Sequence, residues 1–185
     1  MKITDDILLE GCLKGDRQAQ NQLYQKYKGL LFGVCLRYAK DRDEAQDILQ
    51  DGFVKIFSNL YQYKTKGVLI GWMRRVVVNT ALEHLRKRKW QWVDVPMEQF
   101  EDMTEIEEES FDKKYAPILI KLIQQLPDGY RTVFNLYVME GYTHNEIAEI
   151  LQITITTSRT QLFKAKKSLR KMLEQHLIGS SKTRA

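Results

Sequence analysis

Two groups of side chains in this sequence are suited to contact nucleic acid. The first lies in segment 71–89, which combines aromatic, amide and basic groups: Trp72, Arg74, Arg75, Asn79, Arg86, Lys87 and Arg88. Aromatic rings and guanidinium planes stack on unpaired bases, and an amide can hydrogen-bond the edge of a base that has left the stack. The segment favours single-stranded DNA over a closed duplex. The alternative is structural: Trp72 would pack in the core, and Asn79 would be a buried amide whose hydrogen bonds are all made within the protein.

The second group lies near the C-terminus, at the start of the last expected helix: Thr157, Ser158, Arg159, Thr160, Phe163, Lys164, Lys166 and Lys167. Small hydroxyl residues let a helix end approach phosphates closely, and helix N–H groups favour anions. Arg159 can reach a guanine edge or a phosphate, and Gln161 offers an amide. Phe163 suits contact with a thymine methyl group or a sugar. Packing on the preceding helix is the alternative interpretation of Phe163.

A third group is acidic. Asp43, Asp47, Gln50 and Asp51 follow one face of an expected helix, between the residues of its apolar stripe. Such a face can dock on a basic helix of a partner protein. It can also be an ordinary solvated face.

Catalytic chemistry is poorly supported by the sequence. His84, His144 and His176 lie in different expected helices, without the spacing of metal ligands, and no glycine-rich phosphate loop or nucleophile motif occurs. The two cysteines, Cys12 and Cys35, lie in apolar helical patterns and are expected to be buried reduced thiols. We expect no enzyme activity, no metal, no cofactor and no small-molecule substrate.

The elements that must position these groups all show the helical period, which predicts an all-α fold. Asp16 and Asp128 are suited to cap helices, and Gly141 to end one. Thr143 to Glu146 is a capping box opening a helix. A break over Gln152–Thr154 and a helix from about Thr156 complete a helix-turn-helix spacing.

Charge divides the chain into parts. Residues 1–89 hold 17 basic and 10 acidic residues, net +7; residues 90–112 hold 9 acidic and no basic ones, net −9; residues 113–185 hold 12 and 5, net +7. Basic modules indicate a polyanionic partner. We predict two small helical domains, 1–89 and 113–178, an acidic flexible linker over 90–112 and a flexible tail over 179–185. A short acidic helix packed on a basic module is the alternative for the linker.

Three segments, in this order and spacing, resemble the extracytoplasmic-function group of bacterial RNA polymerase sigma factors. They are "DRDEAQDILQDGFVKIFSNL" (41–60), "GWMRRVVVNTALEHLRKRK" (71–89) and "LPDGYRTVFNLYVMEGYTHNEIAEILQITITTSRTQLFKAKKSL" (126–169). The resemblance covers nearly the whole chain. It implies a polymerase-binding helix, a promoter-melting helix and a −35 recognition domain, joined by a linker threaded through the polymerase.

The resemblance also implies residue roles. Asp47, Gln50, Asp51 and Phe53 fall where core RNA polymerase is bound, and Asp43 extends that face. Asn79 falls where an unpaired −10 base is captured, beside Trp72 and Arg75. Arg159, Thr160, Phe163 and Lys164 fall where the −35 major groove is read. An anti-sigma factor is a further implied partner.

The chain departs from the family pattern at the turn of the helix-turn-helix. Gln152 stands where the family often has glycine, and Ile155 and Thr156 stand where it often has an acidic residue and glycine. Gln152 must therefore adopt the turn conformation, at a cost of about 1 kcal/mol, or shift it.

Two other functions remain as alternatives. A stand-alone helix-turn-helix regulator would bind duplex DNA as a dimer, but it has no need of the motifs at 41–60 and 71–89. A helical interaction protein without a nucleic acid partner does not explain two modules of net charge +7. No apolar run approaches the ~18 residues of a membrane span, and no signal peptide precedes Ile7, so we expect a cytoplasmic protein.

Overall fold

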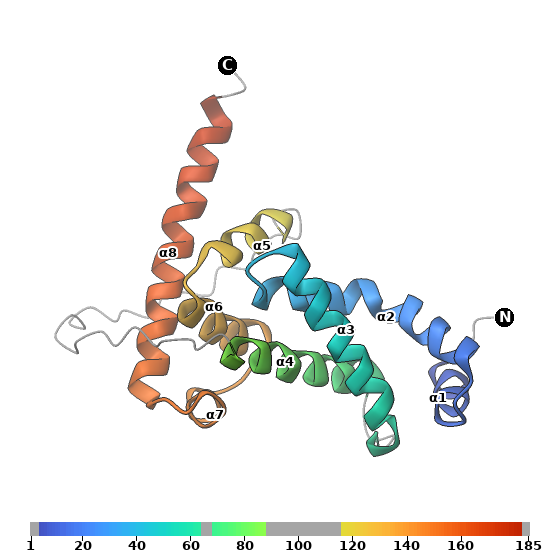
Figure 1. Cartoon of the computed structure of the whole chain (residues 1–185). Helices are drawn as coiled ribbons and strands as arrows, with labels where there is room; N and C mark the ends of the chain where they lie inside the picture. The colour runs from blue at the N-terminus through green and yellow to red at the C-terminus, as the bar shows by residue number, and fades with distance from the viewer. Residues whose placement is uncertain (1–3, 64–67, 88–115, 183–185) are drawn as a thin grey trace. The chain divides into compact units, whose positions relative to one another are not determined.

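The computed structural model describes residues 4–63, 68–87 and 116–182, with side chains from 118 to 176 in the last range. The elements in these ranges are all helical, which confirms the all-α prediction (Figure 1). The chain divides into two compact units, Met1–Lys89 and Trp90–Ala185. The predicted linker at 90–112 lies outside the described residues. Within the described ranges, no helix has the length and apolar character that a membrane crossing requires.

The first unit contains α1 (Asp5–Leu13), α2 (Arg17–Tyr38), α3 (Arg42–Asn59), the short 3₁₀ helix η1 (Leu60–Gln62) and α4 (Leu69–Lys87). The side chain of Asp16 accepts a hydrogen bond from the Gln18 N–H and caps α2, as predicted. Asp41 caps α3 in the same way through the Glu44 N–H. Helices α2, α3 and α4 pack against one another and bury an apolar stripe of each: Leu23, Leu31, Cys35, Ile48, Ile56, Met73, Val77 and Ala81.

Helix α1 is tied to α2 by one carboxylate. Asp5 Oδ1 lies 2.6 Å from Lys26 Nζ, and the Tyr27 hydroxyl donates to Asp5 Oδ2 over 2.7 Å. Burial acts to raise the pKa of Asp5, but the hydrogen bonds from Lys26 and Tyr27 outweigh it, so this pKa is lowered. The carboxylate therefore stabilises the α1–α2 contact above its unfolded pKa, and this contribution is lost as the pH falls through the lowered value.

Helix α3 lies close against α4 at Gly52. A Cβ atom on Gly52 would lie 3.0 Å from Cγ2 of Val77 on α4. Glycine thus permits a helix–helix contact that a larger side chain would force apart. The same pair of helices is joined at its surface by Lys55 with Glu83 and by Asp51 with His84.

The second unit contains α5 (Ala116–Gln125), α6 (Asp128–Phe134), the π-helix η4 (Asn135–Met139), α7 (His144–Leu151) and α8 (Ile155–Lys182). Its core is formed by side chains from all five elements, including Ile123, Val133, Leu136, Ile147 and Ala165. Helices α5, α6 and α7 pack on the first part of α8, which extends well beyond them (Figure 1). Helix α8 continues to Lys182 and so includes residues 179–182, which the sequence predicted as the start of a flexible tail.

The corner between α5 and α6 is organised by a buried arginine. Arg131 is 2% exposed; its guanidinium donates to the Gln124 carbonyl over 2.8 Å and pairs with the Asp128 carboxylate. The prediction that Asp128 caps α6 is wrong, because Pro127 occupies the N-cap position and makes no side-chain cap hydrogen bond. Asp128 instead neutralises a charge that would be costly to bury alone.

The segment after α6 also differs from the expected regular helix. Residues Asn135–Met139 form a π-helix, in which Asn135 and Leu136 are buried while Tyr137 and Val138 are 36% and 43% exposed. The segment ends, as predicted, at Gly141, whose φ of 78° suits glycine.

We predict that Gly52→Val lowers the free energy of unfolding of the first unit by about 1–3 kcal/mol, because the new side chain would overlap Val77. Gly29→Val in α2 is the matched control, since a Cβ on Gly29 meets nothing within 4 Å. The free energies of unfolding of both variants are measured by urea denaturation, with hydrogen exchange of the α3 and α4 amides as the readout. Equal stability of the two variants would show that the α3–α4 approach does not need glycine.

Candidate nucleic-acid and polymerase interface

The acidic face predicted on α3 is exposed. Asp43, Asp47, Gln50 and Asp51 are all exposed, while Ala45, Ile48 and Leu49 are buried on the opposite side of the helix. Asp51 differs from the others because its carboxylate lies 2.8 Å from Nε2 of His84 on α4. This contact links the acidic face to the helix that carries the predicted single-strand contacts.

Phe53 does not belong to this face. It is 4% exposed and its ring packs edge-on against Tyr24, with centroids 4.6 Å apart, and beside Phe57. The prediction of direct polymerase contact by Phe53 is corrected to a packing role, because the ring is enclosed between α2 and α3.

Helix α4 presents a polar stripe on a different side from its buried apolar stripe. Arg75 and Asn79 are exposed one turn apart, and Arg86 and Lys87 are exposed near the C-terminal end. Asn79 is therefore not a buried structural amide, which was the alternative interpretation. Arg74 is half-buried, and Arg88 lies outside the described residues.

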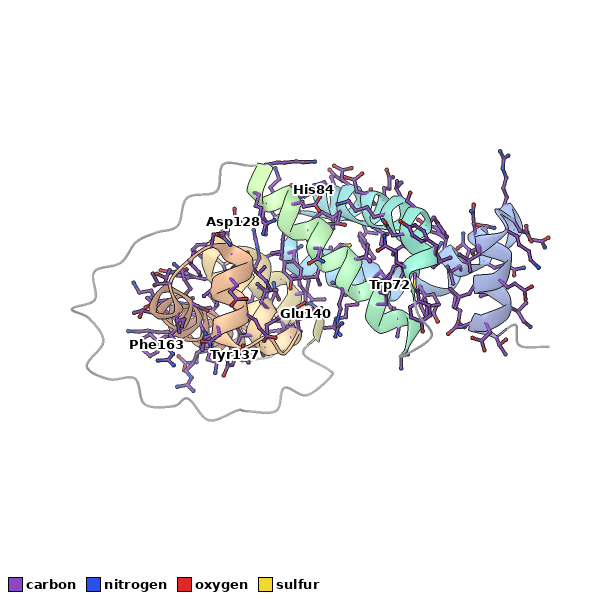
Figure 2. All side chains as sticks on the ribbon, turned by 90° about the horizontal axis from the view of Figure 1, so that it is seen from below. Trp72, His84, Asp128, Tyr137, Glu140 and Phe163 are labelled. Carbon is purple, nitrogen blue, oxygen red and sulfur yellow. The ribbon has the colours of Figure 1, made fainter. Side chains whose placement is uncertain are left out.

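Trp72 is half-buried at the start of α4. Its ring centroid lies 5.7 Å from that of Tyr63, with the planes 49° apart. Figure 2 shows Trp72 and His84 near opposite ends of this helix. Part of the Trp72 indole thus remains available for stacking while the rest is supported by Tyr63.

The helix-turn-helix predicted in the second unit is present. Thr143 and Glu146 form the capping box: the Thr143 N–H donates to Glu146 Oε2 over 2.8 Å, and the Glu146 N–H donates to Thr143 Oγ1 over 3.3 Å. The Thr143 N–H and the Thr143 hydroxyl both donate to the Glu146 carboxylate, and these two bonds lower its pKa. Gln152 ends α7 with φ 56° and ψ 48°, so of the two expected outcomes it adopts the left-handed turn conformation rather than shifting the turn.

The first turn of α8 is more enclosed than the sequence suggested. Thr154 accepts a hydrogen bond from the Thr157 N–H over 3.0 Å, and the two hydroxyls lie 2.8 Å apart, which leaves Thr157 half-buried. Three further polar residues of this helix, which were expected to face DNA, are buried: Ser158, Thr160 and Gln161 at 0%, 7% and 1% exposure. Thr160 donates to the Thr156 carbonyl within the helix.

The predictions of direct DNA contact by Ser158 and Thr160 are therefore corrected, and so is the suggestion for Gln161. Their faces of α8 are covered by the neighbouring helices. Arg159 and Lys167 are exposed, and Phe163, Lys164 and Lys166 are half-buried. The outward face of α8 is consequently basic, with one arginine in its first turns and lysines further along.

One residue of this region was missed by sequence reasoning. His144, the first residue of α7, lies with Nδ1 2.9 Å from Ser158 Oγ, and its ring stacks on Tyr137. Residues 144 and 158 stand on different helices, fourteen positions apart, so no periodic pattern could have paired them.

Comparison with known proteins identifies both units. The sequence model of sigma-70 region 2 matches residues 23–91, and that of sigma-70 region 4 matches residues 117–169. The RNA polymerase sigma-H factor of Pseudomonas aeruginosa is 30% identical over 181 residues, which cover 92% of this chain and 94% of the relative. The ECF RNA polymerase sigma-E factor of Haemophilus influenzae is 26% identical over 184 residues, 94% of this chain and 97% of the relative.

Among solved structures, the chain is similar to the sigma factor RpoE in its complex with the anti-sigma factor NepR from Bartonella quintana. The identity is 18% and the TM-score 0.49, over 83% of this chain and 96% of that one. From the sequence matches, the chain belongs to the sigma-70 family, in its extracytoplasmic-function group.

We predict that Gln152→Gly raises the free energy of unfolding of the second unit by about 0.5–1 kcal/mol, because glycine adopts the left-handed conformation without a Cβ penalty. The exposed bond from Gln152 Nε2 to the Glu149 carbonyl is lost and offsets part of this gain. Lys121→Gly, at an exposed position inside right-handed α5, is the control and should destabilise by about 1 kcal/mol. Hydrogen exchange of the α7 and α8 amides measures the free energy of unfolding of both variants. If Gln152→Gly destabilises the second unit, the left-handed Gln152 is not strained.

Proposed function

We propose that this chain binds core RNA polymerase and directs it to specific promoters, with the first unit docking on polymerase and capturing unpaired −10 bases and the second unit reading the −35 duplex. Its work is then binding rather than catalysis, carried out in the cytoplasm beside the polymerase.

One observation carries the proposal. Both sigma-70 regions match in order, and the motif residues Asp47, Asn79 and Arg159 are each exposed on a helix whose apolar stripe is buried. A stand-alone helix-turn-helix regulator would account for the second unit alone. It would leave the acidic face of α3 and the polar stripe of α4 without a role.

The three exposed faces suit three different contacts. The carboxylates of α3 complement a basic partner surface. The amide and guanidinium groups of α4 can hold bases that have left the stack. Arg159 can form a bidentate contact with a guanine edge, while Lys167 is suited to a phosphate.

Strand opening in this scheme uses binding energy alone. A contact that forms only with unpaired bases stabilises the open complex relative to the closed one, and so shifts the equilibrium between them. Asn79 is the residue that we assign to such a contact.

Run-off transcription tests the proposal directly. Core RNA polymerase from the host, supplied with this chain, should initiate at a small set of sites in a genomic fragment library, and core polymerase alone should not. Transcripts whose start sites are unchanged by adding the chain would overturn the proposal.

We predict that Asp43→Lys combined with Asp47→Lys weakens core polymerase binding about tenfold or more through charge repulsion. Stability should change by less than about 0.5 kcal/mol at Asp47, which is exposed within the helix, and by up to about 1 kcal/mol at Asp43, which lies in the first turn of α3. Asp6→Lys combined with Glu10→Lys on α1 is the control with the same change of charge. Fluorescence-detected titration with core polymerase measures both. Equal affinities of the two double variants would contradict docking through α3.

We predict that Asn79→Ala leaves recruitment intact and impairs opening, because only unpaired bases engage the amide. Run-off transcript from a duplex template should fall about tenfold, as expected for the loss of a good base contact. The yield should partly recover on a template with a preformed −10 bubble. Asn21→Ala, an exposed asparagine on α2, is the control. Normal permanganate reactivity of duplex promoters with the Asn79 variant would show that Asn79 is not a base contact.

A further inference from the structure

The imidazole of His144 joins three elements of the second unit. It begins α7, its Nδ1 lies 2.9 Å from Ser158 Oγ on α8, and its ring stacks on Tyr137 of η4 at 4.5 Å between centroids and 26° between planes. Tyr137 is labelled in Figure 2. A residue held from two sides in this way can fix the angle between α7 and the first turns of α8.

The Ser158 side of this contact is buried. Ser158 is 0% exposed, so its hydroxyl is enclosed by protein, and its N–H donates to the Thr154 carbonyl at the start of α8. A buried hydroxyl that loses its partner costs more than an exposed one, because water cannot replace the bond. The His144–Ser158 contact is therefore costly to break.

The surroundings of His144 favour its neutral form. Burial, Arg159 and Lys166 all lower its pKa. A neutral imidazole protonated on Nε2 accepts on Nδ1, and the Ser158 hydroxyl can then donate to it. The hydrogen bond between His144 and Ser158 can therefore form without a positive charge on the imidazole next to the basic face of α8.

Ser158 directly precedes Arg159, the exposed arginine that we assign to base reading. A recognition helix reads bases only when its first turns enter the groove at the right angle, and small displacements weaken directional hydrogen bonds. Phosphate contacts by flexible lysines tolerate such displacements better.

From this geometry we propose that His144 is a positioning residue for promoter reading: through Ser158 it orients the first turns of α8 so that Arg159 discriminates between duplex sequences. The inference rests on the proposed function of the second unit, because it assigns a residue that supports the same reading face.

The test compares discrimination, not affinity alone. Holoenzyme made from core polymerase and the wild-type chain first enriches a 35-base-pair duplex from a randomised pool. The affinities of wild type and variants are then measured for that duplex and for a shuffled duplex of equal composition. The variants are His144→Phe, which keeps a ring on Tyr137, Ser158→Ala, which removes one atom, and the two combined. His176→Phe and Ser168→Ala, on the same α8, are the controls.

We expect His144→Phe and Ser158→Ala each to lower the ratio of selected to shuffled affinity about fivefold, the effect of one lost hydrogen bond. The combined variant should lose no more than either single one, since both remove the same contact. Affinity for the shuffled duplex should stay close to that of the controls. The thermal unfolding midpoint should fall in His144→Phe, which leaves the buried Ser158 hydroxyl without its partner, and should fall less in the combined variant, which removes that hydroxyl.

Three results would overturn the inference while leaving the proposed function intact: full discrimination in Ser158→Ala, additive losses in the combined variant, or equal losses on both duplexes. Failure of the wild-type holoenzyme to enrich any sequence would overturn the proposed function itself, and with it this assignment.

Discussion

An amphipathic helix buries only one stripe of its surface, and this constraint decides which side chains of the chain are left for a partner. In α4, Met73 and Val77 fill the core of the first unit, so Arg75 and Asn79 must face outwards. Helix α3 packs on this part of α4 through Gly52, which leaves little space for a side chain beside Val77. The acidic face of α3 and the polar stripe of α4 are therefore consequences of the same packing, and the Asp51–His84 contact joins them at the surface.

In the second unit, α8 also buries only one face, and the turn between α7 and α8 places that face against the other helices. The capping box at Thr143 begins α7, and the left-handed Gln152 ends it, so the chain reverses over a few residues and α8 starts against α7. Burial of one face of α8 leaves Arg159 and the lysines outside. The buried Arg131 and the His144–Ser158 contact hold the supporting elements, and neither contributes an exposed group to the basic face. The residues that we propose for DNA reading and the residues that support them are thus different residues of the second unit.

Periodicity and local chemistry predicted much of this from the sequence. The helical fold, the capping box at Thr143, the end at Gly141 and the exposed acidic face of α3 all depend on residues close together in the chain. The errors concern residues whose surroundings are set by other elements. Ser158 and Thr160 are small and polar, which suits a DNA face or a tight helix contact, and only the position of the neighbouring helices distinguishes the two. The π-helix over Asn135–Met139, which contains the exposed Tyr137, has no clear signal in composition.

In the proposed function, the two units contact different parts of one promoter in different states of pairing. Cys12 and Cys35 are buried, and burial raises the pKa of both thiols, that of Cys35 to about 12, so an iron chelate coupled to an added surface cysteine labels that position selectively. Gly71→Cys on α4 and Thr156→Cys on α8 provide two such exposed positions. In the open complex, radicals released at residue 71 should cut within the permanganate-reactive bases, and those released at residue 156 should cut duplex DNA upstream. Cleavage by both at one site, or by residue 71 only in paired DNA, would contradict the account.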